Sequence, residues 1–149
     1  MDKWNKIEHV IDVNQAKVET QADMILVDGA IFTFKNTGLT RRVFVNEEKG
    51  IVVKVPVSEY DQKYNNMEAE MWEELNDEDR SKFAETKLLS NGYIIQEYLH
   101  TLDDLKTLEW LGRDMTMAEI RFAQSCRNEV GFDEEGNLKC YDFDEYKKY

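Results

Sequence analysis

The sequence is poor in proline, glycine and cysteine: its 149 residues include one proline, seven glycines and two cysteines. So little proline and glycine excludes a flexible interdomain linker, and we therefore expect one domain over residues 1–149. The two cysteines, Cys126 and Cys140, are too few for a disulfide framework, and their spacing fits no zinc motif. His9 and His100 are isolated in the sequence and belong to no metal-binding motif.

Basic residues and long hydrophobic runs are also scarce. Nineteen lysines and arginines stand against 31 acidic residues, which gives a formal charge of −12. A general binder of nucleic acid or anionic membrane needs a basic face, so this charge disfavours direct nucleic-acid binding. It suits a protein partner with a basic surface, or it serves solubility alone. No run is long enough to span a bilayer and the N-terminus has no apolar signal core, so we expect no membrane contact and a cytoplasmic location.

The residues that are present predict a folded α+β protein. Apolar residues make up 42% of the chain and include three tryptophans, seven tyrosines and seven phenylalanines, which is enough for a substantial core. Helical spacing predicts a short amphipathic helix within residues 3–20 and helices over residues 58–75, 101–111 and 116–127. Alternating or β-branched runs bounded by turn residues predict strands over 24–35 with a turn at 28–29, and over 42–45, 51–55, 86–89, 93–99, 130–132 and 138–144.

The strand over residues 50–56 carries a single charge, Lys54. A lysine in an apolar strand either extends its ammonium to solvent or points into a cleft toward an anion. The apolar face predicted for the next helix consists of Tyr64, Met67, Met71, Trp72 and Leu75. Glu68 lies on or beside that face, and because an inward carboxylate needs a cation, we expect it to pair with Lys54. The other acidic residues of 68–79 are expected on the solvated side of one continuous helix.

This order of elements resembles the protein-kinase-like fold, over roughly residues 30–145. Lys54 in its valine run is similar to the phosphate-contacting lysine of kinases, and Glu68 to the helix glutamate that pairs with it. Residues 93–99 look like the strand and hinge that contact adenine. The hairpin that ends at Asp142-Phe143 looks like the one that carries the metal-binding aspartate. The resemblance implies an N-lobe over 1–99, with an antiparallel sheet and one helix equivalent to kinase αC, and a reduced helical lobe with a terminal hairpin over 100–149.

The resemblance also implies which residues would form a site. A nucleotide, ATP with Mg²⁺, would contact Lys54 and Glu68, the loop glycine Gly38, and Glu97 and Leu99 at the hinge. The metal would be held by Asp142 and Asn128. No cofactor follows from the sequence without this resemblance, and the same charged residues are also compatible with a purely structural buried ion-pair cluster.

Several departures from the kinase pattern argue against efficient protein phosphorylation. Asn36 and Arg41 stand where two of the phosphate-loop glycines belong, and fewer glycines keep the backbone farther from phosphates. Counting back from Asn128 places Ala123 at the position of the catalytic base, and no His-Arg-Asp sequence exists. Asp144 replaces the glycine of Asp-Phe-Gly. Only five residues follow it, so we expect no activation segment and almost none of the helical lobe that binds protein substrates.

Three functional hypotheses remain open. The first is a degenerate, catalytically inactive kinase-like protein that acts through protein–protein interaction, similar to short kinase-like proteins encoded by bacteriophages that inhibit or modulate a host protein. The second is a minimal phosphotransferase that binds ATP and a metal through Lys54, Glu68, Asn128 and Asp142. The third is an acidic inhibitor that mimics DNA with the carboxylates of a helix over 68–79, for which an ordinary solvated helix face is the simpler interpretation.

Overall fold

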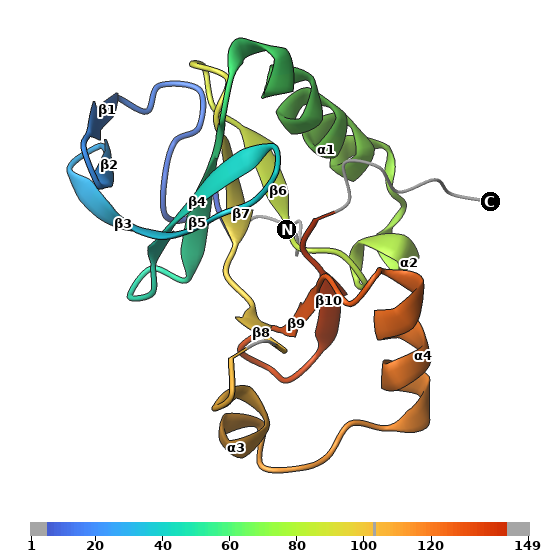
Figure 1. The fold of residues 1–149 in the computed structure, drawn as a ribbon. Helices are drawn as coiled ribbons and strands as arrows, with labels where there is room; N and C mark the ends of the chain where they lie inside the picture. The colour runs from blue at the N-terminus through green and yellow to red at the C-terminus, as the bar shows by residue number, and fades with distance from the viewer. Residues whose placement is uncertain (1–5, 103, 143–149) are drawn as a thin grey trace.

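The computed structural model describes residues 6–102 and 104–142, and Figure 1 shows them as an upper part and a lower part. The upper elements are β1 (Val18–Gln21), β2 (Met24–Val27), β3 (Ala30–Thr37), β4 (Arg41–Asn46), β5 (Ile51–Pro56), the 3₁₀ helix η1 (Glu59–Asp61), α1 (Gln62–Glu74), α2 (Asp77–Arg80), β6 (Thr86–Leu88) and β7 (Ile94–Glu97). The lower elements are β8 (His100–Thr101), α3 (Thr107–Leu111), α4 (Met117–Ser125), β9 (Val130–Phe132) and β10 (Leu138–Cys140). None of the described helices combines the length and apolar character needed to cross a membrane.

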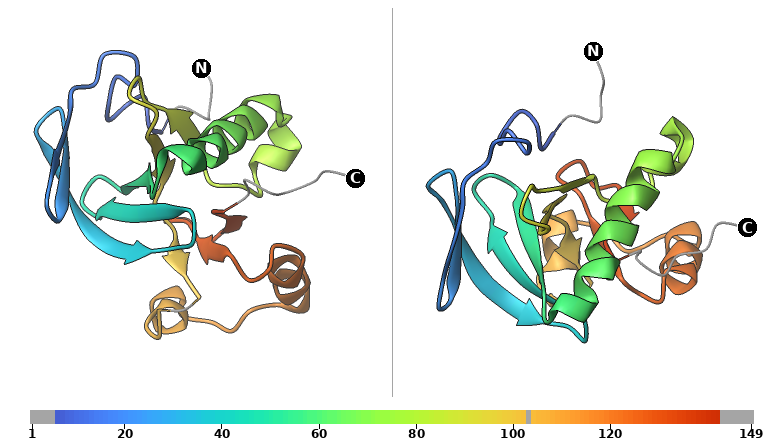
Figure 2. Two further views of the ribbon diagram at one scale, coloured as in Figure 1. Left: turned by 45° about the horizontal axis from the view of Figure 1, so that its top comes forward. Right: turned by 90° about the horizontal axis from the view of Figure 1, so that it is seen from above.

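The upper strands form one curled antiparallel sheet in the order β1-β2-β3-β4-β5-β7-β6, which confirms the α+β class. The predicted turn between β2 and β3 is present: Asp28 and Gly29 both have positive φ, 51° and 82°, as a tight two-residue hairpin requires. Gly50 and Gly92 take positive φ in the predicted turns before β5 and β7. Figure 2 shows the curl of this sheet, and α1 packs against β5 and β6.

The N-terminal segment fills the curled sheet, and the short helix predicted within residues 3–20 is reduced in its described part. Over residues 6–20 only one helical turn forms, in which the Ile11 amide donates to the Ile7 carbonyl at 2.9 Å. Ile7, Ile11, Val13 and Ala16 are buried in one core with side chains from β2, β3, β4, β5 and β7. The chain then continues as β1, whose backbone groups are satisfied by pairing with β2. The polar side chains of this segment do not predict a strand. Trp4, part of the prediction, lies outside the described residues.

The lower part has its own small sheet, in the order β10-β9-β8, and a second core. The core connects α1 and the segment after α2 to α4, β9 and β10, through Trp72, Leu75, Phe83, Ala123, Cys126, Val130 and Cys140. The predicted hairpin over 130–144 is confirmed as β9 and β10 up to Cys140, and its residues 143 and 144 lie outside the described residues. The predicted helix over 116–127 is α4, which begins with a capping box between Thr116 and Glu119.

The predicted acidic helix over 68–79 is interrupted. Helix α1 ends at Glu74, and buried Leu75 takes an extended conformation at ψ 140°. Asn76 then caps the separate helix α2, because its Oδ1 accepts from the Asp79 amide at 2.8 Å. A continuous acidic helix face is therefore absent from this described segment.

Two further helix predictions need correction. Helix α1 starts at Gln62, after η1, and the Ser58 hydroxyl makes no capping bond to the backbone. Its buried residues are Asn65, Glu68, Ala69 and Trp72, whereas Met67, predicted on the buried face, is exposed. The helix predicted over 101–111 is shorter, since β8 takes up Thr101 in pairing with β9 and α3 covers only Thr107–Leu111. It ends as predicted at Gly112, whose φ is 78°.

We predict that Gly131→Ala destabilises the protein by about 1–3 kcal/mol, the range typical of overpacking. A Cβ at Gly131 in β9 would lie 2.7 Å from the Leu99 Cβ and 2.8 Å from the His100 carbonyl oxygen. Urea unfolding followed by tryptophan fluorescence measures the loss. The matched control is Gly38→Ala, since a Cβ there meets nothing closer than 3.5 Å. Equal stability of the two variants would contradict the close approach of β8 and β9.

Candidate functional site

A cleft of about 1050 Å³ lies between the sheet and the lower part. It is lined by the β3–β4 loop, by β4 and β5, by the segment from β7 to β8, and by the ends of α4 and β10. Apolar side chains that include Val43, Val52 and Leu99 line it together with the charged side chains of Arg41 and Lys54. Its size is at the upper end of small-molecule sites, which span about 300–1,000 Å³.

Lys54 and Glu68 form the ion pair that the sequence predicts. Lys54 projects from β5 and Glu68 from α1, and the two side chains are 5% and 0% exposed. The Lys54 Nζ donates to the Glu68 Oε1 at 2.8 Å and to the Tyr141 carbonyl oxygen at 2.5 Å. The Gln96 Nε2 donates to the same Glu68 oxygen at 3.1 Å. Lys54 thus points inward to an anion, and it also binds the backbone that precedes Asp142.

Arg41 is a charged member of this site that the sequence pattern did not predict. It is the first residue of β4, and its side chain is 4% exposed. Its Nη1 donates to the Glu68 Oε2 and, at 3.3 Å, to the Asn65 Oδ1, while its Nη2 donates to the Asp142 Oδ1 at 2.5 Å. The guanidinium therefore bridges the two carboxylates to which the kinase resemblance gives separate roles.

The strand pairing of the β4–β5 hairpin is sufficient to place Arg41 beside Lys54. Strands β4 and β5 pair so that Val43 lies opposite Lys54 and Arg41 opposite Pro56. Side chains two residues apart on one strand share a face, so Arg41 and Lys54 are diagonal neighbours on the same face of the sheet. The kinase pattern places Arg41 in the loop before the strand, so its position in this register was not predicted.

The hinge and loop residues predicted for nucleotide contact all line the cleft. The Gly38 amide donates to the Arg41 carbonyl oxygen at 2.8 Å, which closes the β3–β4 loop. Leu99 is buried and lines the cleft. Glu97 also lines it, but its carboxylate accepts from the Lys139 Nζ at 3.0 Å. The Lys139 ammonium therefore already compensates much of the negative charge of Glu97.

Of the two predicted metal ligands, Asp142 lines the cleft and Asn128 is not among its lining residues. Asp142, the last described residue, lines the cleft with a side chain 33% exposed. Asn128 is exposed in a left-handed turn, with φ 62°, and its neighbours Arg127 and Glu129 line the cleft instead. Over 6–102 and 104–142, no cluster of three or more His, Cys, Asp or Glu residues is placed to hold a metal ion. Phe143 and Asp144 lie outside the described residues.

Glu129 adds a third carboxylate near this charged group. Burial raises the pKa of its carboxyl above the ordinary 4.5, and the negative charge of Asp142 raises it further. Lys54 and Arg127 act in the opposite direction, but more weakly than burial. Ionised Glu129 therefore works against folding at neutral pH.

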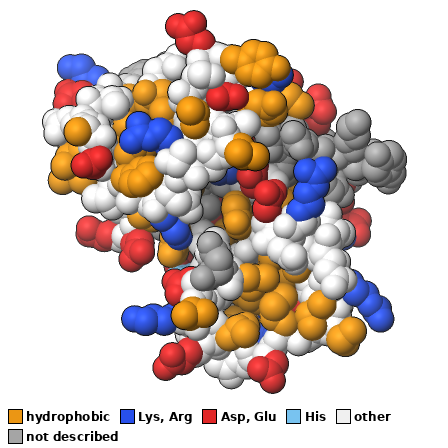
Figure 3. All heavy atoms as spheres, viewed as in Figure 1, with side chains coloured by type: hydrophobic (Ala, Val, Ile, Leu, Met, Phe, Trp, Pro, Cys, Tyr) orange, Lys and Arg blue, Asp and Glu red, His pale blue; other side chains and the backbone are white. Residues whose placement is uncertain are grey.

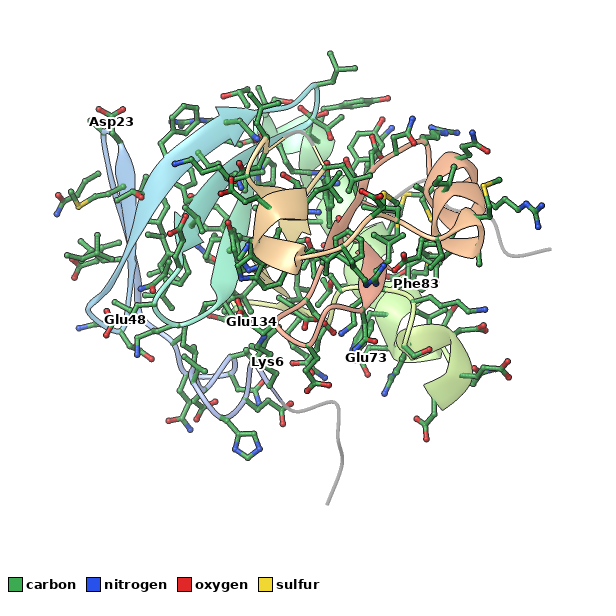
Figure 4. All side chains as sticks on the ribbon, turned by 90° about the horizontal axis from the view of Figure 1, so that it is seen from below. Lys6, Asp23, Glu48, Glu73, Phe83 and Glu134 are labelled. Carbon is green, nitrogen blue, oxygen red and sulfur yellow. The ribbon has the colours of Figure 1, made fainter. Side chains whose placement is uncertain are left out.

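A second hollow, of about 510 Å³, lies on the other side of Glu97. Figure 4 labels Lys6 and Glu134 at this hollow, and Lys139 and Asp133 also line it. The Lys139 Nζ lies 3.1 Å from an Asp133 carboxylate oxygen, and the Lys6 Nζ lies 3.6 Å from a Glu97 oxygen. Its two lysines are thus both engaged with carboxylates, and the larger cleft is the better candidate site.

Comparison with known proteins adds no relative to this description: no family model, curated protein or solved structure matches the chain.

We predict that Arg41→Ala costs about 3–5 kcal/mol of unfolding free energy, because it leaves Glu68 and Asp142 short of a cation in a buried setting. Arg41→Lys should recover only part of this loss, since an ammonium does not span two carboxylates as a guanidinium does. Urea denaturation measures both values. The control is Arg121→Ala on the exposed side of α4, which should stay within about 0.5 kcal/mol of wild type. An Arg41→Ala variant as stable as this control would refute the bridge.

We predict that Glu129→Gln stabilises the protein at pH 7.5 and that the gain shrinks toward pH 4.5. A carboxyl whose pKa is raised in the folded state holds its proton more tightly when folded. Stability is therefore lost as the pH rises from its unfolded pKa through its folded pKa, and glutamine removes that loss. Unfolding free energies across this pH range, with exposed Glu109→Gln as control, measure the effect. A pH-independent change would contradict it.

Proposed function

We propose that this chain is a compact protein-kinase-like protein that has lost phosphotransfer and acts by binding another protein. The order of its elements supports the proposal. A lysine-bearing strand, β5, is followed by a glutamate-bearing helix, α1, then by two strands, short helices and a hairpin that leads to Asp142. The Lys54–Glu68 pair lies beside a cleft between the two parts, which suits the same interpretation.

The main support for a loss of phosphotransfer is the bridge that Arg41 makes between Glu68 and Asp142. In a working kinase site, the aspartate equivalent to Asp142 holds a metal ion that neutralises the transferred phosphate. Here the Arg41 guanidinium lies against both Asp142 and Glu68. The two positive charges of Arg41 and Lys54 are matched by the two negative charges of these carboxylates, so the group is stable without a divalent cation. A metal ion at the Asp142 Oδ1 or the Glu68 Oε2 would have to displace a buried arginine.

Surface properties support a protein partner. The formal charge of −12 favours a partner with a basic surface. Figure 3 shows hydrophobic side chains gathered over the lower part of the molecule, and several apolar residues of α3 and α4 are exposed, among them Leu108, Met117 and Ile120. Apolar side chains beside polar ones are typical of surfaces that bind proteins.

Nucleotide binding without phosphotransfer is the second candidate, and the cleft itself favours it. Val43, Val52 and Leu99 offer apolar contact for a base, and Lys54 and Arg41 offer donors for phosphates. A phosphate would have to compete with Glu68 and Asp142 for these donors. The third hypothesis, a DNA mimic, loses support because the acidic segment is divided between α1 and α2, and Glu73 is paired with Lys87 at 3.1 Å.

Thermal unfolding with ATP, in Mg²⁺ or in EDTA, separates these functions. We predict no Mg²⁺-dependent rise in Tm and no transfer of the γ-phosphate to protein, because Arg41 occupies both carboxylates. Bound ligand at 100 times its Kd would stabilise the fold by about 2.7 kcal/mol, a shift of several degrees. A Mg²⁺-dependent shift that is lost in Lys54→Met and kept in exposed Lys49→Met, together with phosphate transfer, would overturn the proposal.

Two other outcomes have clear meanings. A shift that is equal in Mg²⁺ and EDTA, and is lost in Lys54→Met, would establish the second candidate. For a protein partner once isolated, the affinity should fall as salt rises, and folded Lys54→Met should bind as wild type does. Loss of partner binding in that folded variant would show that the charged group itself makes the contact.

A further inference from the structure

The two cysteines of the chain both line the cleft. Cys126 follows α4 and Cys140 ends β10, and both belong to the core that joins α1 to the lower part. Both are free thiols, 5% and 1% exposed. The cleft thus gives a small oxidant a route to a pair of buried thiols.

Backbone hydrogen bonds hold the two cysteines in register. The Cys126 carbonyl oxygen accepts from the Glu129 amide at 3.0 Å, which closes a turn between α4 and β9. The Glu129 carbonyl oxygen accepts from the Tyr141 amide at 3.1 Å, and Val130 pairs with Cys140 in the β9–β10 ladder. One turn and one ladder step therefore separate Cys126 from Cys140, although 13 residues lie between them in the sequence.

The Cys140 thiol donates to the Asp142 carbonyl oxygen at 3.6 Å, and the two thiols influence each other's ionisation. Hydrogen bonding with the Cys140 thiol lowers the pKa of Cys126, with a smaller contribution from the Ser125 hydroxyl, 3.9 Å from the Cys126 sulfur. The same interaction and burial raise the pKa of Cys140. Cys126 is thus the more readily ionised thiol of the pair and the better nucleophile toward an oxidant.

We propose that Cys126 and Cys140 form a reversible disulfide when the protein is exposed to hydrogen peroxide. The Cys126 thiolate attacks one peroxide oxygen, the O–O bond breaks, and hydroxide leaves and takes up a proton as water, so that Cys126 becomes a sulfenic acid. The Cys140 sulfur then attacks the Cys126 sulfur, loses its proton, and expels the sulfenic oxygen as a second water. Two thiols are oxidised by two electrons and one peroxide is reduced to two waters.

This disulfide would restrain the part of the cleft that is lined by the end of β10 and the two residues after it. Cys140 is next to Tyr141, whose carbonyl oxygen accepts from Lys54, and two residues from Asp142, which binds Arg41. A covalent bond to Cys126 would tie this segment to the end of α4. Oxidation would therefore restrict the opening of the cleft whether or not the cleft binds a nucleotide, and the inference does not depend on the proposed function.

The test is to expose the reduced full-length protein to a small excess of hydrogen peroxide and measure its intact mass and its Tm. We predict a mass loss of about 2 Da, one cross-linked peptide that joins Cys126 to Cys140, and reversal by dithiothreitol. The Tm should rise on the order of 5–10 °C, because the bond closes a short loop in the unfolded chain. Cys126→Ser and Cys140→Ser should show neither the mass loss nor the rise.

Three results would overturn the inference. The first is addition of two or three oxygens to either cysteine of the native wild-type protein, since a partner in contact would trap the sulfenic acid first. The second is no reaction in the native state while the denatured chain cross-links readily. The third is a disulfide that lowers Tm, which would mean that the native fold does not accommodate the bond. These readouts come from the wild-type chain, so they hold even where a serine variant fails to fold.

Discussion

The buried carboxylate of Glu68 is the group on which the arrangement of the cleft depends. An ionised side chain with no exposed surface is tolerated only when cations and hydrogen-bond donors surround it. Lys54 from β5, Arg41 from β4 and Gln96 from β7 all donate to it. Lys54 also donates to the Tyr141 carbonyl oxygen, and Arg41 also donates to Asp142, which follows β10. One carboxylate on α1 thus connects the curled sheet to the segment that closes the lower part.

The two parts of the molecule are joined both by this charged group and by apolar contacts. The second core brings Trp72 and Phe83 of the upper part against Cys126, Val130 and Cys140 of the lower part. Dispersion and burial there are not directional, whereas the bonds of Arg41 and Lys54 fix where the end of β10 lies. One wall of the cleft between these contacts is partly apolar. The charged side chains beside it, Arg41 and Lys54, already form ion pairs with Glu68 and Asp142. Such a site supports the proposal of binding without phosphotransfer, and the proposed disulfide would restrain one part of its wall.

The predictions that succeeded and failed differ in the range of the interactions involved. The Asp28-Gly29 turn, the hairpin over 130–144 and the Lys54–Glu68 pair were predicted because adjacent residues or one helix periodicity determine them. The N-terminal segment failed because its apolar spacing matches a helix, while the hollow of the sheet selected a single turn. The continuous acidic helix failed because Asn76 starts a new helix once Leu75 enters the second core.

The sequence by itself determined the α+β class, the turns, and the need for a cation beside Glu68, because local conformational preference and the cost of burying a charge act wherever those residues occur. Only the tertiary structure decided that Arg41 is the second cation, that Asn128 is exposed while Glu129 lines the cleft, and that the two cysteines share one core beside the cleft. Each of these depends on strand register or on contacts between residues far apart in the chain. Such contacts are set by how whole elements pack, and the sequence near each residue does not contain them.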